Sequence, residues 1–206
     1  MNIPISKINQ LTYLEAVDKI IELNKHAKDF WSDALGWAPI EASNLLSKSR
    51  LDWQVSLSYS MKKWNECSCP ESENGDLILA WANLGTLVEG TIKLFLSVYL
   101  NDYMDDSANY KNKRGIIQPD EITFDKLRQY FRDKIWKYKE SYSEFDNWVL
   151  FMQQRRNAIH AFRSREIGTF NEFKTHTKKY LAFLMYHLDR LPYPDDQYGS
   201  DLYLAD

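Results

Sequence analysis

The stretch Ser143-Glu-Phe-Asp-Asn-Trp-Val-Leu-Phe-Met-Gln-Gln-Arg-Arg-Asn-Ala-Ile-His-Ala-Phe162 is predicted to form one helix around which the rest of the chain is organised. Ser143 is a favourable N-cap residue, and Asp146 follows three positions later, where an acidic side chain can reach back to the start of the helix. Neither glycine nor proline interrupts the pattern before Gly168. We therefore expect the helix to run unbroken through the whole stretch.

One half of this expected helix is apolar and yet carries charged residues. At about 100° per residue, Arg155 and Arg156 project into the apolar half, and His160 lies at its edge. A charge buried without a partner is costly, so these side chains need a counter-charge, a water-filled cleft or a ligand. The apolar half consists of Phe145, Trp148, Val149, Phe151, Met152, Ala158, Ile159 and Phe162.

Composition favours a single all-α domain. The 206 residues are 44% hydrophobic and 15% aromatic, enough for a real core, which excludes wholesale disorder. With only 7 glycines and 6 prolines, long helices are favoured over a turn-rich β fold, and we predict an up-and-down bundle of about six helices. The net charge of −3 gives no global basic signature, so nucleic-acid binding would need a local patch.

Apolar spacing and capping residues predict the other helices. Residues 77–99 are apolar around most of the helix circumference, which is typical of a central helix, and Asn74 or Asp76 is expected to cap it. Thr169 and Glu172 are predicted to form the capping box of the last helix. The remaining helices are expected at 11–30, 41–64 and 123–139, and the last helix is expected to end near Leu191.

The predicted organisation is an N-terminal helical extension (1–70), a helical core (71–192) and an acidic C-terminal tail (193–206). The first residues lack a charged segment followed by an apolar run, so no signal peptide is expected. Asn83, Glu89 and Lys93 interrupt the central apolar stretch, which argues against a membrane span and favours a cytoplasmic protein. Cys67 and Cys69 are expected to be two thiols in a loop, with no metal or other cofactor.

The segment Arg155-Arg156-Asn157-Ala158-Ile159-His160 resembles the motif of HEPN domains, in which an Arg is followed after four to six residues by a His. HEPN proteins are small helical bundles, and many are metal-independent RNases. The family commonly has its polar residue directly after the Arg, whereas here Arg156 stands between Arg155 and Asn157. Arg155 fits the usual spacing and is preferred as the family arginine, with Arg156 kept as the alternative.

The resemblance implies a composite active site in a homodimer. Two protomers would pair so that their motif helices meet, and each would bring an Arg and a His to one cleft. Arg155 would hold the scissile phosphate, while His160 would transfer the protons of the reaction, because imidazole ordinarily titrates near neutral pH. The ribose 2′-oxygen would attack the phosphorus and leave a 2′,3′-cyclic phosphate, with no metal required.

Further residues are candidates for this site. Asn157 is expected to orient the imidazole or contact the phosphate. Glu89, the acidic residue of the central helix, resembles the acidic or polar residue with which HEPN domains face the motif; alternatively it forms a surface pair with Lys93. The loop expected at 102–119 carries a basic run that either seats RNA phosphates or is simply solvated. Its basic residues are Lys111, Lys113 and Arg114.

The function expected from the resemblance is RNA cleavage, in a toxin or defence effector with an antitoxin or other protein partner. One alternative is a catalytically silent HEPN dimer that serves as an RNA-binding or protein-interaction module, because fold likeness does not establish activity. A third interpretation is a purely structural helical protein with a polar core cluster. The other histidines, which lack such company, are expected to be packing or surface residues: His26, His176 and His187.

Overall fold

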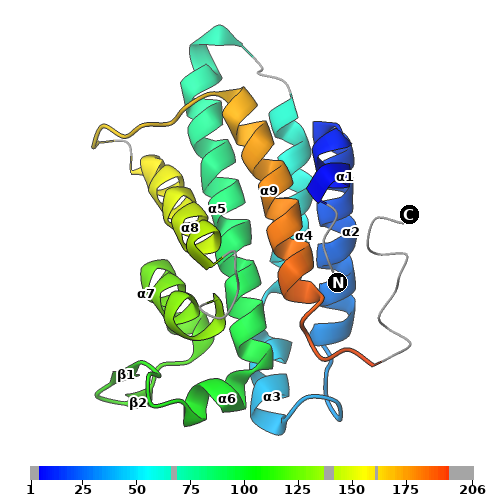
Figure 1. The fold of residues 1–206 in the computed structure, drawn as a ribbon, viewed down its shortest axis with the longest axis vertical. Helices are drawn as coiled ribbons and strands as arrows, with labels where there is room; N and C mark the ends of the chain where they lie inside the picture. The colour runs from blue at the N-terminus through cyan, green and yellow to red at the C-terminus, as the bar shows by residue number, and fades with distance from the viewer. Residues whose placement is uncertain (1–4, 66–68, 137–141, 161, 195–206) are drawn as a thin grey trace.

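The computed structural model describes residues 5–65, 69–136, 142–160 and 162–194. Over these residues the chain forms nine α-helices, several 3-10 turns and one two-stranded hairpin (Figure 1). The predicted all-α bundle is therefore confirmed. One hydrophobic cluster runs from Ile8 to Tyr193, so the helices of the N-terminal part share a core with those that follow.

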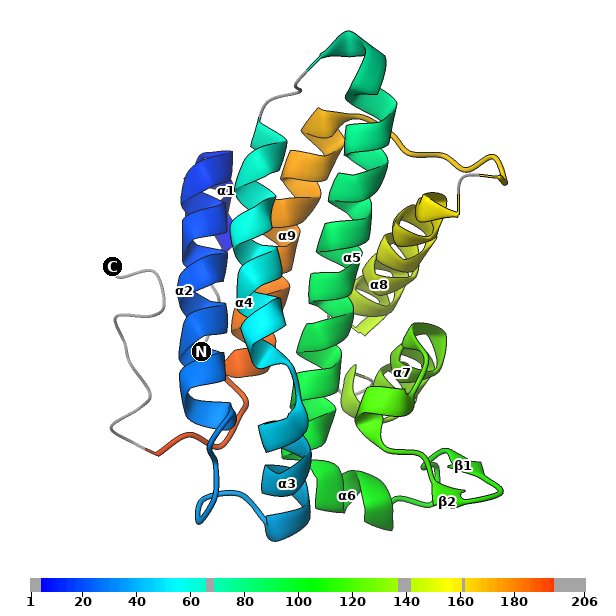
Figure 2. The same ribbon diagram turned by 180° about the vertical axis from the view of Figure 1, so that it is seen from behind.

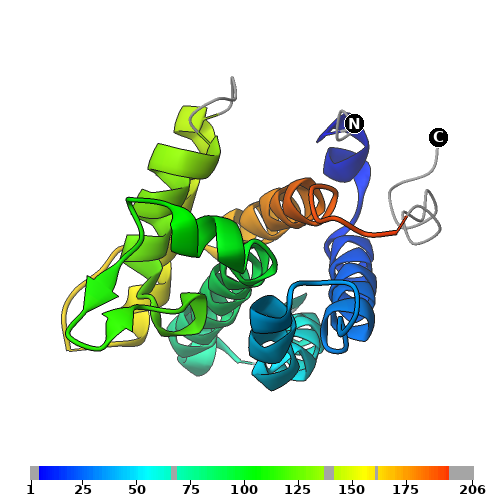
Figure 3. The ribbon, with the colours of Figure 1, turned by 90° about the horizontal axis from the view of Figure 1, so that it is seen from below.

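Helix α5 (Glu73–Val98) is the central element, as its sequence predicted. It contacts α8, α9, α3 and α4, and Figure 3 shows it between the α7–α8 side and the α2–α4 side of the molecule. By length and composition alone Pro70–Val98 could cross a membrane, but most of it is buried inside the bundle. The expected caps were wrong, because Asn74 and Asp76 lie inside the first turns of the helix and Ser72 is the N-cap residue.

Of the first four helices, α3 and α4 pack against α5, while α1 packs against α9. Helix α2 begins with the Thr12–Glu15 capping box and lies against α4 and α9. The single helix expected at 41–64 was wrong: the chain becomes extended at Ser49, which separates α3 from α4. These four helices are α1 (Ile5–Gln10), α2 (Tyr13–Trp31), α3 (Ile40–Lys48) and α4 (Leu51–Ser60), with a 3-10 turn at Met61–Asn65.

The chain after α5 crosses the lower end of the bundle in Figure 1. The loop expected at 102–119 contains the end of α6 and a short hairpin in which Lys111 pairs with Ile116. The helix expected at 123–139 is present as α7 followed by a π-helical turn, and residues 137–139 lie outside the described part. The elements are α6 (Leu100–Asp105), β1 (Lys111–Asn112), β2 (Gly115–Ile116), a 3-10 turn (Pro119–Glu121), α7 (Phe124–Tyr130) and the π-helical turn (Phe131–Trp136).

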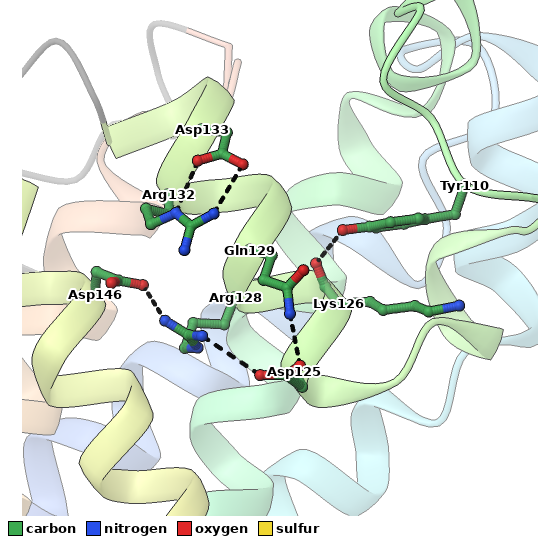
Figure 4. A network of polar contacts seen from close by, with 8 residues as sticks. All are labelled: Tyr110, Asp125, Lys126, Arg128, Gln129, Arg132, Asp133 and Asp146. Carbon is green, nitrogen blue, oxygen red and sulfur yellow. Dashed lines mark hydrogen bonds and ion pairs between the residues drawn. The ribbon is translucent and has the colours of Figure 1, made fainter.

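A buried arginine joins α7 to α8. Arg128 donates to Asp146 at 2.5 Å and to Asp125 at 3.4 Å (Figure 4). Asp146 therefore binds a neighbouring helix, not the start of its own helix as predicted. The proposed N-cap was also wrong, because Ser143 lies within α8 (Tyr142–Arg156), and its side chain is outside the described part.

The motif helix ends earlier than expected. Helix α8 stops at Arg156, and a 3-10 turn (Asn157–Ile159) leads to His160, whose φ of −83° and ψ of 58° are not helical. Ile159 is 43% exposed and Phe162 fully exposed, so the apolar half predicted for one long helix is broken at its C-terminal end. The chain then turns toward α9 (Phe170–Leu188), and Tyr193, the first residue of the predicted tail, is buried.

Candidate functional site

The two arginines of the motif point to different neighbours, and Arg155 points into the protein. Its side chain is 8% exposed, and Nη2 donates to Glu172 Oε1 at 2.9 Å. Its guanidinium lies 4.8 Å from the ring centre of Phe151 and 5.7 Å from that of Trp81. Burial, a counter-charge and two aromatic faces account for this charge without any ligand.

The partner of Arg155 also starts the last helix. Thr169 is the N-cap of α9 and its hydroxyl accepts from Glu172 N–H at 3.2 Å, which is half of the predicted capping box. The Glu172 carboxylate binds Arg155. Gly168 has a φ of +68°, and a Cβ there would lie 1.8 Å from Glu172 Oε2. The start of α9 thus needs a glycine beside this ion pair.

Trp81 of α5 completes this group of residues. Its indole N–H donates to the Ile167 carbonyl at 2.7 Å, one residue before Gly168. We call Arg155, Trp81, Gly168 and Glu172 the Arg155 cluster. It ties the chain that follows the motif to α5, α8 and α9 at one place, which explains why α8 does not continue as a straight helix past Arg156.

Arg156 points to α5 on the other side of the helix. Its Nη1 lies 2.6 Å from Glu89 Oε2, and the other oxygen of the same carboxylate lies 3.1 Å from Lys93 Nζ. Both interpretations of Glu89 therefore describe the structure: it faces the motif and it pairs with Lys93. We call Glu89, Lys93 and Arg156 the Glu89 cluster. The Arg156 side chain is 31% exposed, so solvent reaches it far more than it reaches Arg155.

A glycine brings the two helices of the Glu89 cluster together. A Cβ on Gly85 would lie 2.6 Å from Arg156 Cβ, so any side chain there would push α8 away from α5. Lys93 also donates to the Asp120 carbonyl at 2.8 Å, which fixes its ammonium at the edge of α5. The cluster is thus held at a close helix–helix crossing and is not a loose surface pairing.

The other motif residues lie at the end of α8. Asn157 is half-buried, and its backbone carbonyl accepts from His160 N–H at 3.2 Å. His160 is exposed, and within the described part of the chain its imidazole has no hydrogen-bond or ion-pair partner. The structure therefore presents His160 to solvent about one turn beyond the Glu89 cluster. It is flanked by the exposed side chains of Ile159 and Phe162.

The basic run lies elsewhere. The side chains of Lys111, Lys113 and Arg114 are exposed on the hairpin. Figure 1 shows this hairpin at the opposite end of the α7–α8 layer from the C-terminal end of α8. One protomer therefore does not bring these three residues to His160.

Two of the remaining histidines are packing residues between α8 and α9. His176 stacks on Phe151 at 4.3 Å and its Nδ1 accepts from Trp148 Nε1 at 3.0 Å. His187 accepts from Trp136 Nε1 at 3.2 Å, and its Nδ1 lies 2.7 Å from the Phe183 carbonyl. Burial lowers the pKa of His176 to about 4 and that of His187 to about 3, so both rings are neutral near pH 7.

The described residues contain no group of three or more His, Cys, Asp or Glu side chains placed to hold a metal ion. Cys69 is exposed and its thiol donates to Ser72 Oγ at 3.2 Å, while Cys67 lies outside the described part. Comparisons with protein-family models, curated proteins and solved structures found no match. The function must therefore be argued from the motif and its surroundings.

Proposed function

We propose that this protein is an endoribonuclease of the HEPN type that cleaves RNA by attack of a ribose 2′-oxygen and requires no metal ion. The observation that carries the proposal is the contact between Arg156 and Glu89, next to an exposed His160. An acidic residue on an earlier helix that faces the motif is a feature the resemblance implied and that composition alone would not require.

Exposure favours Arg156 as the phosphate-binding residue. A guanidinium must reach the non-bridging oxygens of the scissile phosphate, and the Arg156 side chain is 31% exposed against 8% for Arg155. Arg155, the residue preferred from spacing, would then act as a positioning residue that fixes the end of α8. Glu89 would hold the Arg156 guanidinium in place until the substrate phosphate arrives.

His160 is assigned the proton transfers. As a general base it would take the proton of the 2′-hydroxyl, and as a general acid a second imidazole would protonate the departing 5′-oxygen. The bond from the 2′-oxygen to phosphorus forms as the bond to the 5′-oxygen breaks, and a 2′,3′-cyclic phosphate remains. Asn157, which lies in the turn between Arg156 and His160, would orient the imidazole or contact the phosphate.

Two imidazoles in one reaction require two copies of the chain. Ile159 and Phe162 flank His160 and are 43% and 107% exposed, an apolar surface that suits burial against a second protomer. We therefore propose a homodimer in which the C-terminal ends of two α8 helices meet. In this assembly the Lys111–Arg114 hairpin of each copy would bind distant parts of the RNA. A cytoplasmic setting and an antitoxin-like protein partner belong to the same proposal.

The alternative is a silent HEPN dimer that binds RNA or protein without cleaving. One observation favours it: the Arg156 guanidinium is already neutralised by Glu89 at 2.6 Å, so a phosphate must compete with a carboxylate for it. In the enzyme, by contrast, the phosphate is expected to win Arg156 from the Glu89 carboxylate, because negative charge develops on the phosphate in the transition state.

RNA cleavage in EDTA decides between the two. Wild-type protein should cleave single-stranded RNA, and His160→Ala should lower the rate on the order of 10²–10⁴-fold, as for the loss of a general acid–base group. Arg163→Ala is the matched control, because it removes an exposed side chain from the same segment. Uncleaved RNA with retained binding supports the silent module, and a monomer by light scattering contradicts the composite site.

A further inference from the structure

A hollow lies on the face of α5 that carries Glu89. It is a cavity of about 460 Å³ lined mainly by residues of α3, α4 and α5 and of the turn between α3 and α4. Figure 2 shows the ribbons of these three helices near one another. Leu46, Leu57 and Leu94 form apolar walls, and Glu89 and Lys93 stand at its α5 edge. The Glu89 carboxylate thus faces this cavity and Arg156 at once.

One wall of the cavity is an exposed indole. Trp53 is 58% exposed, although tryptophan is among the residues with the highest average burial. The Arg50 guanidinium lies over its ring at 4.0 Å from the centre. Arg50 is held by a bidentate pairing with Asp52 at 2.9 and 2.7 Å, and both partners are about half exposed. The Arg50 guanidinium thus covers one face of the indole, and bases of single-stranded nucleic acids stack on aromatic rings and on guanidinium planes alike.

The floor of the cavity is fixed by a glycine. Gly90 leaves room for the Gln54 side chain, since a Cβ on Gly90 would lie 2.2 Å from Gln54 Oε1. Gln54 Nε2 donates to the Leu87 carbonyl at 2.8 Å, which anchors the carboxamide against α5. The cavity is therefore a formed hollow with apolar sides and a few placed polar groups, as small-ligand sites commonly are.

The cavity and the motif share one row of charges. Lys93 and Glu89 line the cavity together with Trp53, and the row of charges continues from them to Arg156, with 3.1 Å between Lys93 and Glu89 and 2.6 Å between Glu89 and Arg156. A nucleotide whose phosphate reaches Arg156 would thus have its neighbour beside the cavity. We propose that the cavity is a subsite for one base of single-stranded RNA, stacked on Trp53, next to the phosphate bound by Arg156.

This inference rests on the proposed function and names its substrate class, unpaired RNA. A base-paired duplex keeps its bases stacked inside the helix and offers none to Trp53. Of the two cations at the cavity, Arg50 is in an ion pair that is about half exposed on both sides, and such a pair exchanges readily for a phosphate because exposed pairs are weak. Stacking tolerates any base, so the subsite should raise the affinity for RNA and favour single strands over duplexes. It should discriminate little among base sequences.

The test uses the full-length protein in EDTA with a fluorescein-labelled unstructured RNA of about a dozen nucleotides, long enough to span a typical single-strand site. Trp53→Ala should weaken RNA binding by about tenfold, the scale of one lost base–aromatic stack, whereas Trp53→Phe should keep most of it. Tyr59→Ala is the matched control, since Tyr59 is 49% exposed on the same helix but does not line the cavity.

A second measurement does not depend on cleavage. The indole N–H signal of Trp53, assigned by its loss in Trp53→Phe, should shift when adenosine monophosphate is added and should not respond in the presence of duplex RNA alone. If RNA is cleaved but Trp53→Ala binds and cleaves like Tyr59→Ala, the subsite is overturned and the proposed function stands. If the Trp53 effects appear without cleavage, the subsite stands and the RNase proposal falls. If neither appears, both are overturned.

Discussion

Arg155 and Arg156 are neighbours on α8, but they differ in exposure and in the helices that they contact. On the α9 side, Arg155 is 8% exposed between Glu172 and two aromatic rings. On the α5 side, Arg156 is 31% exposed and shares Glu89 with Lys93 at the rim of a cavity. Residues one position apart on a helix point about 100° away from each other. The role of a motif residue is therefore set by the helices that it faces, and here only one of the two arginines is accessible to a substrate.

Loss of Arg155 should give the largest effect on stability. Arg155→Ala removes a buried guanidinium from two aromatic rings and leaves the 33% exposed Glu172 carboxylate without its counter-charge, and we expect the free energy of unfolding to fall by about 3 kcal/mol from both losses together. Arg156→Ala removes a 31% exposed guanidinium and leaves Glu89 paired with Lys93, so it should cost about 1 kcal/mol or less. Urea unfolding of both variants measures the difference, and equal losses would contradict the two-sided account.

The glycine of the Arg155 cluster should show the next largest effect. Gly168→Ala places a Cβ against Glu172 on a backbone with a φ of +68°, and we expect a loss of about 2 kcal/mol. Gly36→Ala separates the two causes, because Gly36 has a φ of +85° and nothing within 4 Å of its Cβ position. If both substitutions cost the same, the Cβ contact adds nothing and the cluster is looser than its geometry indicates.

Acid should weaken the α9 side specifically. Burial lowers the pKa of His187 to about 3. In mildly acidic solution this residue is therefore protonated in the unfolded chain but still neutral in the folded protein. The contribution is fully present above about pH 6.5, the ordinary pKa of histidine. It is lost as the pH falls toward 3, by about 1.4 kcal/mol per pH unit. The pH dependence of the urea midpoint should be flatter in His187→Gln, and an unchanged slope would contradict this assignment.

Glu89→Gln should have the smallest effect on stability and a clear effect on cleavage. The amide keeps the shape but cannot hold Arg156 as an ion pair, so unfolding should change by less than about 1 kcal/mol. RNA cleavage in EDTA should fall measurably while the helical circular-dichroism signal stays. Glu41→Gln, an exposed acid on α3, is the control. Unchanged cleavage in Glu89→Gln would remove Glu89 from the site.

The features that could be predicted are those that depend on the residue pattern within one segment. The apolar circumference of residues 77–99 identified α5 as the central helix, and Thr169 marked the start of α9. These two features are written in the spacing of single segments, and the structure has them. The position of Glu89 opposite the motif was expected from the resemblance to HEPN domains, with a surface pair to Lys93 as the alternative.

What could not be predicted depends on contacts between segments. No glycine or proline marks the end of α8 at Arg156; the turn is fixed by the bonds from Trp81 to Ile167 and from Arg155 to Glu172, which are distant in sequence. The break between α3 and α4 at Ser49 likewise carries no local signal. To choose between Arg155 and Arg156, one must know which helix lies on each side of α8. To predict the Trp53 cavity, one must know that α3 and α4 are separate helices.

The most direct test of the account is the single-turnover rate of RNA cleavage in EDTA for Arg156→Lys beside Arg155→Lys. Lysine keeps the charge but loses the planar fork that binds two phosphate oxygens. The account predicts a rate loss on the order of 10²-fold or more for Arg156→Lys, with a 2′,3′-cyclic phosphate on the wild-type product. It predicts a near wild-type rate per folded molecule for Arg155→Lys. The reverse order, or cleavage by neither variant nor wild type, would contradict it.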